Sequence, residues 1–224
     1  MTKWTKPPID AEKVRTLADT HSLDILTASI LTRRGVLEPE QIAYFMESDE
    51  RFLHNPMLFP QMEQAVERVL HAAEEEERVL VCGDKDADGI TATVLMVEAL
   101  RSLGIEPHWR VPVGEEDYGL NSEVLKAKAA EDITLVIAVD CGITNFEEVE
   151  LANTLGMEVL IFDHHLPREG SIPPAYAVIN PKLPGSYPFE GLCAAALASK
   201  FQWALCLAGT DLWCEEFCLV LAKE

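Results

Sequence analysis

Acidic residues follow three separate apolar runs of the 224-residue chain, and histidines join them after the third run. Run 79–82 leads into three aspartates at alternate positions, run 135–139 into one aspartate, and run 159–162 into an Asp-His-His triplet. These polar residues are Asp84, Asp86, Asp88, Asp140, Asp163, His164 and His165. Carboxylates and imidazoles can bind divalent cations and transfer protons, so the three segments are the first candidates for chemistry.

The positions of the acids favour one shared site over three independent turns. A single aspartate after a strand is usually a helix cap or a turn residue, but three successive runs that end in acid are poorly explained in that way. Parallel strands present their carboxyl ends at one edge of a sheet, where α/β proteins bind ligands. Carboxylates gathered there repel one another unless protons or cations intervene. The pattern therefore predicts a divalent metal site.

Ligand chemistry narrows the choice of metal and reaction. A set dominated by carboxylates, with one or two imidazoles, favours Mn²⁺ or Mg²⁺. Two such ions bridged by a carboxylate can promote in-line displacement at phosphorus, so phosphoester hydrolysis is the predicted chemistry. Segment 84–89 also matches the start of an EF-hand loop, but its twelfth position is Leu95, where that loop needs a bidentate glutamate.

The remaining sequence predicts the elements that position these residues. Residues 1–76 have the pattern of a helical leader, with helices expected over 10–22, 23–34, 39–47 and from 61 onward. In residues 77–224, apolar runs alternate with helical patterns, which indicates βαβ units. Strands are expected at 79–82, 135–139, 159–162 and 177–179, and helices at 91–103, 122–130, 146–155, 192–207 and 211–222. The predicted fold class is α/β, a parallel β-sheet flanked by helices and preceded by the helical leader.

Composition limits the classes of partner. The formal net charge is −20 and 48% of the residues are hydrophobic, which is typical of a folded acidic protein and argues against one that coats duplex nucleic acid. The N-terminus has no apolar signal core, and the apolar stretch 191–209 is interrupted by Lys200 and Gln202, so no membrane association is expected. The six cysteines form no C-x-x-C pair. We therefore expect a reducing compartment, the cytoplasm.

At these residues the sequence resembles the DHH phosphoesterase family, which is named for the triplet Asp163-His164-His165. The resemblance runs over almost the whole chain from about residue 20. Its motifs lie at 33–35 (Arg-Arg-Gly), 53–56 (Leu-His-Asn-Pro), 65–68, 83–89, 118–120 (Tyr-Gly-Leu), 140–142, 180–182 (Asn-Pro-Lys) and 187–189. The leader helices resemble those of the family's single-strand-specific exonucleases, since the small members that cleave short or cyclic nucleotides usually begin almost directly at the first strand.

The resemblance implies a role for each candidate residue. Asp86, Asp88 and His164 match metal ligands, and Asp140 matches the catalytic carboxylate that bridges two ions, Mn²⁺ or Mg²⁺. His165 matches a catalytic residue that orients or contacts the phosphate. Two further residues are expected to assist: Asp84 by supporting the loop, and Thr91 by helping a helix N-terminus receive a phosphate oxygen. Lys85 departs from the family, which commonly has tyrosine at that position.

The resemblance also implies a substrate, single-stranded DNA, that is trimmed from the 5′ end, and it gives no protein partner. One further metal-binding aspartate is expected beyond Glu224, so we expect an amino-terminal portion of a longer enzyme, with its phosphoesterase domain truncated at the C-terminal end and feebly active alone. Two alternatives remain. One is a phosphodiesterase that acts on short oligonucleotides or cyclic dinucleotides. The other is a non-catalytic scaffold in replication or repair, although such scaffolds tend to lose the ligand residues that this chain retains.

Overall fold

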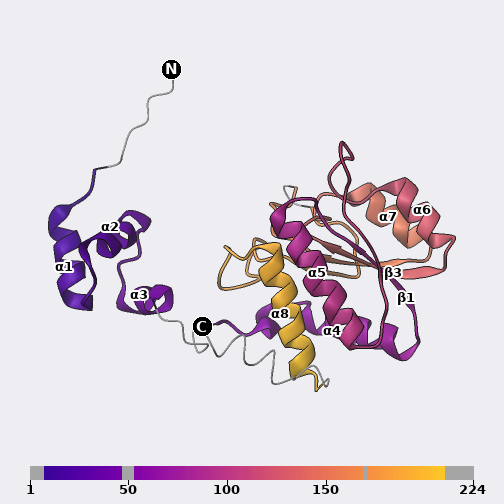
Figure 1. The fold of residues 1–224 in the computed structure, drawn as a ribbon, viewed down its shortest axis with the longest axis horizontal. Coiled ribbons are helices and arrows are strands. Elements are labelled where there is room, and N and C mark those ends of the chain that lie inside the picture. Colours follow the sequence, from indigo (N-terminus) through magenta and orange to yellow (C-terminus); the bar gives the residue numbers. More distant parts are fainter. Residues whose placement is uncertain (1–7, 47–52, 169–170, 210–224) are drawn as a thin grey trace. The chain divides into compact units, whose positions relative to one another are not determined.

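The structure of the chain is a computed structural model that describes residues 8–46, 53–168 and 171–209 (Figure 1). The chain divides into two compact units between Leu53 and His54. This division lies earlier than the boundary expected near residue 76, because the helix over 62–74 packs within the larger unit. The helix expected over 211–222 lies outside the described residues.

The smaller unit contains three helices, α1 (Ala11–His21), α2 (Ile25–Arg34) and α3 (Pro39–Met46). Asp10 begins α1 by accepting hydrogen bonds from the N–H groups of Glu12 and Lys13, and Asp24 caps α2 in the same way. Gly35 ends α2 in the left-handed conformation, with φ of 72°. The helices expected in this region are confirmed.

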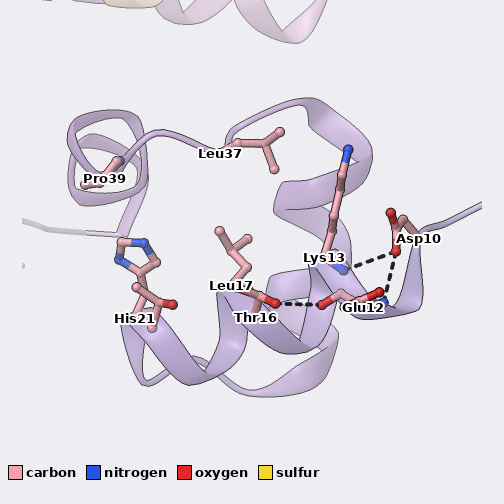
Figure 2. Close-up of a pocket in the computed structure, with 9 residues that line it drawn as sticks. Asp10, Glu12, Lys13, Thr16, Leu17, His21, Leu37 and Pro39 are labelled. Carbon is pink, nitrogen blue, oxygen red and sulfur yellow. Dashed lines mark hydrogen bonds between the residues drawn. The ribbon is translucent and has the colours of Figure 1, made fainter.

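A small core holds these three helices together. It consists of Val14, Leu17, Ala18, Ala28, Leu31 and Ile42. Beside this core lies an open hollow, where Leu17 and His21 of α1 face Leu37 and Pro39 (Figure 2).

The larger unit is an α/β fold around a five-stranded sheet. Its elements in chain order are η2 (Pro56–Leu58), α4 (Met62–Glu74), β1 (Arg78–Cys82), α5 (Ala87–Ser102), β2 (His108–Arg110), α6 (Ser122–Ala129), β3 (Ile133–Val139), α7 (Phe146–Thr154), β4 (Glu158–Phe162), β5 (Ala177–Ile179) and α8 (Ala194–Leu207). All neighbouring strands are parallel, in the order β2-β1-β3-β4-β5. The predicted fold class is confirmed.

Helices cover both faces of the sheet (Figure 1). Successive residues of a strand point to opposite faces, so Val79 and Val81 pack into the core under α4, α5 and α8, whereas Leu80 and Cys82 pack under α6 and α7. Burial on both faces explains why the strands read as continuous apolar runs.

An ion-pair network ties α4 to this sheet. The guanidinium of Arg68, only 8% exposed, contacts Glu77 at 2.7 Å and Glu158 at 2.5 Å. Burial opposes the charge on Arg68, but its hydrogen bonds to Glu77 and Glu158 raise its pKa above the usual value.

The sheet order creates a switch point between β1 and β3. From β1 the chain goes outward to β2 and then returns to β3 on the other side of β1. Connections that leave a parallel sheet in opposite directions open a crevice at the carboxyl ends of the strands, where ligands bind in such folds. The acids that follow β1 and β3 stand at this crevice.

Two elements differ from the expectations. Strand β2 was not predicted, because its three residues, His108–Arg110, carry no apolar run. Helix α5 begins at Ala87 instead of near residue 91, so Asp88 lies within its first turn and Thr91 in its second. The expectation that Thr91 stands at the start of this helix was therefore wrong.

Within the described residues, no helix combines the length and the apolar character needed to cross a membrane.

Candidate metal centre at the carboxyl ends of three strands

Two glycines fix the loop between β1 and α5. A Cβ on Gly83 would lie 1.9 Å from Oγ1 of Thr93, and one on Gly89 would lie 2.6 Å from the main-chain oxygen of Asp84. Asp86 caps α5, since its Oδ1 accepts a hydrogen bond of 2.9 Å from the Gly89 N–H. Only glycine allows these close approaches, so both residues are needed to hold the aspartates of this loop in place.

Asp88 joins this loop to α8. Its Oδ2 accepts a 2.9 Å hydrogen bond from the Ala194 N–H and its Oδ1 a 2.8 Å hydrogen bond from the Ala195 N–H. Burial alone would raise its pKa, but the two N–H groups and the nearby His164 lower the pKa below its ordinary value. The same Oδ2 lies 3.4 Å from Nε2 of His164. Asp88 thus caps a helix 106 residues later while it borders the site.

Asp140 is the most perturbed carboxylate of the site. It is 1% exposed, has a left-handed φ of 59°, and its buried Oδ1 has no hydrogen-bond partner among the described residues. Burial raises its pKa to about 7, and repulsion by Asp88 and Asp86 adds to this effect. A buried anionic oxygen without a donor is unfavourable on its own, and a cation would relieve it.

Both histidines have a ring nitrogen near this oxygen. Nε2 of His164 is 3.2 Å from Oδ1 of Asp140, and Nδ1 of His165 is 3.9 Å from the same atom. Burial lowers the pKa of His164, and the neighbouring His165 lowers it further. Low pKa favours the neutral imidazole, the form that binds metals.

The donor atoms fall into two groups that share Asp140. Asp84, Asp86 and Asp140 each offer an oxygen, and Asp140, His164 and His165 each offer one ligand atom, with all atoms of a group within 4.8 Å of one another. The shared carboxylate is what a pair of bridged cations requires. The buried Oδ1 of Asp84 also has no hydrogen-bond partner among the described residues, so the donor set fits hard divalent cations.

Thr91 and Lys85, the other two residues considered from the sequence, hydrogen-bond to main-chain carbonyls. Thr91 is exposed, and its hydroxyl donates to the Ala87 carbonyl within α5. Nζ of Lys85 donates to the carbonyl oxygens of Gly114 and Glu116, at 3.1 and 3.3 Å.

Two further residues support the site, although no role was assigned to either from the sequence. Asp163 is fully buried, and its Oδ2 accepts from the Ile143 N–H while its Oδ1 accepts from the His165 N–H and lies 2.8 Å from Nδ1 of that ring. Tyr118 donates from its hydroxyl to the Asp140 carbonyl at 2.9 Å. The triplet and the Tyr-Gly-Leu motif contained both residues, but only three-dimensional contacts reveal what they touch.

Comparison with known proteins agrees with this geometry. Residues 78–215 match the model of the DHH family, N-terminal domain. The single-stranded-DNA-specific exonuclease RecJ of Bacillus subtilis is 32% identical over 205 residues, 91% of this chain and 26% of that protein. RecJ of Escherichia coli is 42% identical over 147 residues, 64% of this chain and 25% of that protein.

A solved structure gives the same relationship. RecJ of Thermus thermophilus in complex with Mn²⁺ superimposes with a TM-score of 0.68 at 26% identity, covering 96% of this chain and 30% of that one. The chain thus spans between a quarter and a third of the length of these relatives. Because the family model matches more than half of its residues, the chain belongs to the DHH family.

Proposed function

We propose that this chain carries the metal-binding half of a phosphodiesterase site and that, within a longer protein, it trims single-stranded DNA from the 5′ end. The observation that carries the proposal is Asp140, a buried carboxylate shared by two clusters of metal-binding groups. The relatives named as single-stranded-DNA-specific exonucleases support the substrate, and the Thermus relative in complex with Mn²⁺ supports the metal.

Each residue has a distinct task in this proposal. Asp86, Asp88 and His164 would hold divalent cations, and Asp140 would supply the carboxylate that the two groups of donor atoms share. His165, whose side chain is 46% exposed, contacts the phosphate. Asp84, whose Oδ1 is buried at the same loop, supports these ligands or joins them. Bound Mn²⁺ or Mg²⁺ would supply an activated water and neutralise charge on the phosphate.

Charge explains why a cation is needed. The chain carries a formal net charge of −20 and would repel a polyanion. The carboxylates after β1 and β3 add to this repulsion at the place where a phosphate must approach. Two divalent cations held by these carboxylates would offset their negative charge, so the loaded site would repel a phosphate less than the metal-free site does.

The cytoplasm is the compartment that we propose. Among the described cysteines, Cys82, Cys141 and Cys193 are free thiols, which suits a reducing compartment. Burial raises the pKa of Cys82 to about 12, so this thiol stays protonated and unreactive.

A small activated diester tests the reaction separately from DNA binding. The chain is mixed with bis(p-nitrophenyl) phosphate and Mn²⁺, and release of nitrophenolate is followed for the wild type, Asp140→Asn and Asp132→Asn. We expect Mn²⁺-dependent hydrolysis that Asp140→Asn abolishes and Asp132→Asn retains. A chain that binds Mn²⁺ yet hydrolyses the diester no faster than buffer would contradict the proposed reaction and favour a binding scaffold.

Labelled oligonucleotides test the substrate. Single strands labelled at the 5′ or the 3′ end, matching duplexes and a cyclic dinucleotide are digested in Mn²⁺, with Bacillus subtilis RecJ as the reference enzyme. Early release of the 5′ label from single strands is the expected result. Cleavage confined to the cyclic or very short substrates would favour the alternative phosphodiesterase.

A further inference from the structure

The connection between β2 and α6, residues 111–121, is tied to the loops that follow two other strands. On one side, Nζ of Lys85 donates to the carbonyl oxygens of Gly114 and Glu116. On the other side, the Leu120 N–H donates to Oδ1 of Asn145 at 3.3 Å. The β1 and β3 loops therefore both hold this connection in place.

Gly119 allows the close contact on the second side. It has a φ of 95°, and a Cβ there would lie 2.5 Å from Oδ1 of Asn145. A side chain would clash and strain the backbone, so glycine is required next to Tyr118. The connection that carries Tyr118 is thus held by Lys85 on one side and by Asn145 on the other.

The hydroxyl of Tyr118 lies where the β3 and β4 loops meet. It donates to the main-chain oxygen of Asp140 at 2.9 Å and lies 3.0 Å from Nδ1 of His165. The two rings meet edge to face, with centroids 5.5 Å apart and planes at 73°. One side chain therefore contacts both the turn that carries the shared carboxylate and the more exposed histidine.

The hydrogen bonds of the His165 ring indicate which of its nitrogens carries the hydrogen. Oδ1 of Asp163 lies 2.8 Å from Nδ1, and a carboxylate can only accept, so Nδ1 carries the hydrogen. The Tyr118 hydroxyl uses its own hydrogen for the Asp140 carbonyl and therefore presents a lone pair to the same Nδ1–H. Two oxygens thus share this hydrogen, which leaves Nε2 as the free nitrogen of the neutral ring.

We propose that Tyr118 is a positioning residue that, together with Asp163, fixes the ring orientation and tautomer of His165 relative to Asp140. With Asp163 as its only acceptor, the His165 ring could still tilt about the hydrogen bond between Nδ1–H and Oδ1 of Asp163. A second oxygen on the adjacent loop, itself anchored to the Asp140 carbonyl, removes that freedom. The geometric part of this proposal is independent of the proposed function, and only its effect on turnover rests on that function.

Tyr118→Phe is the variant that tests this role, because it deletes the hydroxyl and retains the ring. Tyr187→Phe is the matched control. Its hydroxyl also donates to a main-chain carbonyl, that of His54 at 2.6 Å, and its ring contacts His54 and Phe59. Both variants lose one hydroxyl-to-carbonyl hydrogen bond, so a general effect on stability appears in both.

Nuclear magnetic resonance gives a readout that needs no catalysis. The 224-residue chain is labelled with ¹⁵N-histidine, and the two-bond spectra of the ring nitrogens are recorded for the wild type and both variants, with His165→Ala and His164→Ala used for assignment. In the wild type the His165 signals should be those of the Nδ1–H tautomer. Tyr118→Phe should shift the His165 Nδ1 signal, because Nδ1–H loses one of its two acceptors while Asp163 still holds the hydrogen there, and it should leave the His164 signals in place. Tyr187→Phe should shift neither.

Kinetics and metal binding complete the test. Groups that orient a functional residue typically change activity about 10–100-fold, so kcat for the diester should fall about 10-fold or more in Tyr118→Phe while the Mn²⁺ dissociation constant changes less than about twofold. Unshifted His165 signals in Tyr118→Phe would overturn the positioning role, whether or not the chain hydrolyses the diester. A loss of Mn²⁺ affinity equal to the loss of kcat would also overturn it, since Tyr118 would then act on the metal through Asp140. A wild type without hydrolysis contradicts only the proposed function, and the His165 signals still decide the role of Tyr118.

Discussion

Replacement of Asp140 by asparagine should stabilise the metal-free chain. The Asp140 carboxylate is 1% exposed, its Oδ1 has no hydrogen-bond partner among the described residues, and burial together with Asp88 and Asp86 raises its pKa to about 7. Asparagine keeps nearly the same shape, tolerates the left-handed backbone at this position, and carries no charge. Without a cation, the carboxylate is therefore a source of instability that the amide removes.

The expected gain depends on pH. The folded chain holds the Asp140 proton more tightly than the unfolded chain, because the folded pKa of about 7 exceeds the ordinary value of 3.8. The contribution of protonated Asp140 to the free energy of unfolding is thus fully present below pH 3.8 and is lost as the pH rises through 7. Linkage gives a penalty of about 4 kcal/mol at pH 8 and about 2 kcal/mol at pH 5 for the ionising carboxylate. Asp140→Asn should recover up to these amounts.

Urea unfolding in EDTA at pH 5 and pH 8 measures the effect. Asp132→Asn is a matched control, because Asp132 lies at the other end of β3 with a nearly equal φ of 60° against 59°, yet its side chain is exposed. We expect Asp140→Asn to be more stable than Asp132→Asn at both pH values, with the larger difference at pH 8. A less stable Asp140→Asn at pH 8, or a gain that is larger at pH 5, would refute the electrostatic reasoning.

Three further predictions concern the site, the core and the substrate. His164→Ala should lose Mn²⁺ in calorimetry, whereas His165→Ala should keep the ion and mainly lose turnover; the reverse pattern would exchange their roles. Arg68→Ala should lower the free energy of unfolding by up to about 3 kcal/mol in urea, because it removes the guanidinium from the partly buried carboxylate of Glu77, 16% exposed. Glu158→Gln, at a side chain 46% exposed, should lower it less. The 224-residue chain should digest labelled single strands more slowly than Bacillus subtilis RecJ, since positioning can supply roughly 7–11 kcal/mol of a barrier and the relatives, of which this chain matches only 25–26%, have more surface for it. Equal rates would show that this chain suffices.

The long apolar strands could be predicted from the sequence because burial on both faces leaves a strong pattern. Runs 79–82, 135–139 and 159–162 fall within β1, β3 and β4. Strand β2 left no such signal, since it is an edge strand of three residues with Trp109 57% exposed. A short edge strand is determined by its neighbour β1 and not by its own composition.

The start of α5 was misjudged for a local reason. Gly89 suggests a loop, but it lies inside the first turn because Asp86 caps that turn through the Gly89 N–H. Helix propensity disfavours glycine, and the close approach of the Asp84 backbone overrides that preference.

The candidate site could be located from strand ends alone, but its supporting contacts could not be predicted. Asp88 caps α8 across 106 residues of sequence, and Tyr118 reaches His165 across 47. Such contacts depend on how loops fold over the sheet, and no periodicity encodes them. The sequence therefore located the charged groups, Asp163 among them, but it did not reveal that Asp163 and Tyr118 contact the His165 ring.

Calorimetric titration with Mn²⁺ tests the central claim most directly, namely that the strand-end carboxylates and imidazoles form a cation site centred on Asp140. The titration is carried out on the wild-type chain, Asp140→Asn and Asp132→Asn at pH 8, where Asp140 is mostly ionised given its pKa of about 7. We expect the wild type and Asp132→Asn to bind Mn²⁺ with similar affinity and Asp140→Asn to show little or no binding. Equal Mn²⁺ affinities for all three proteins would contradict it.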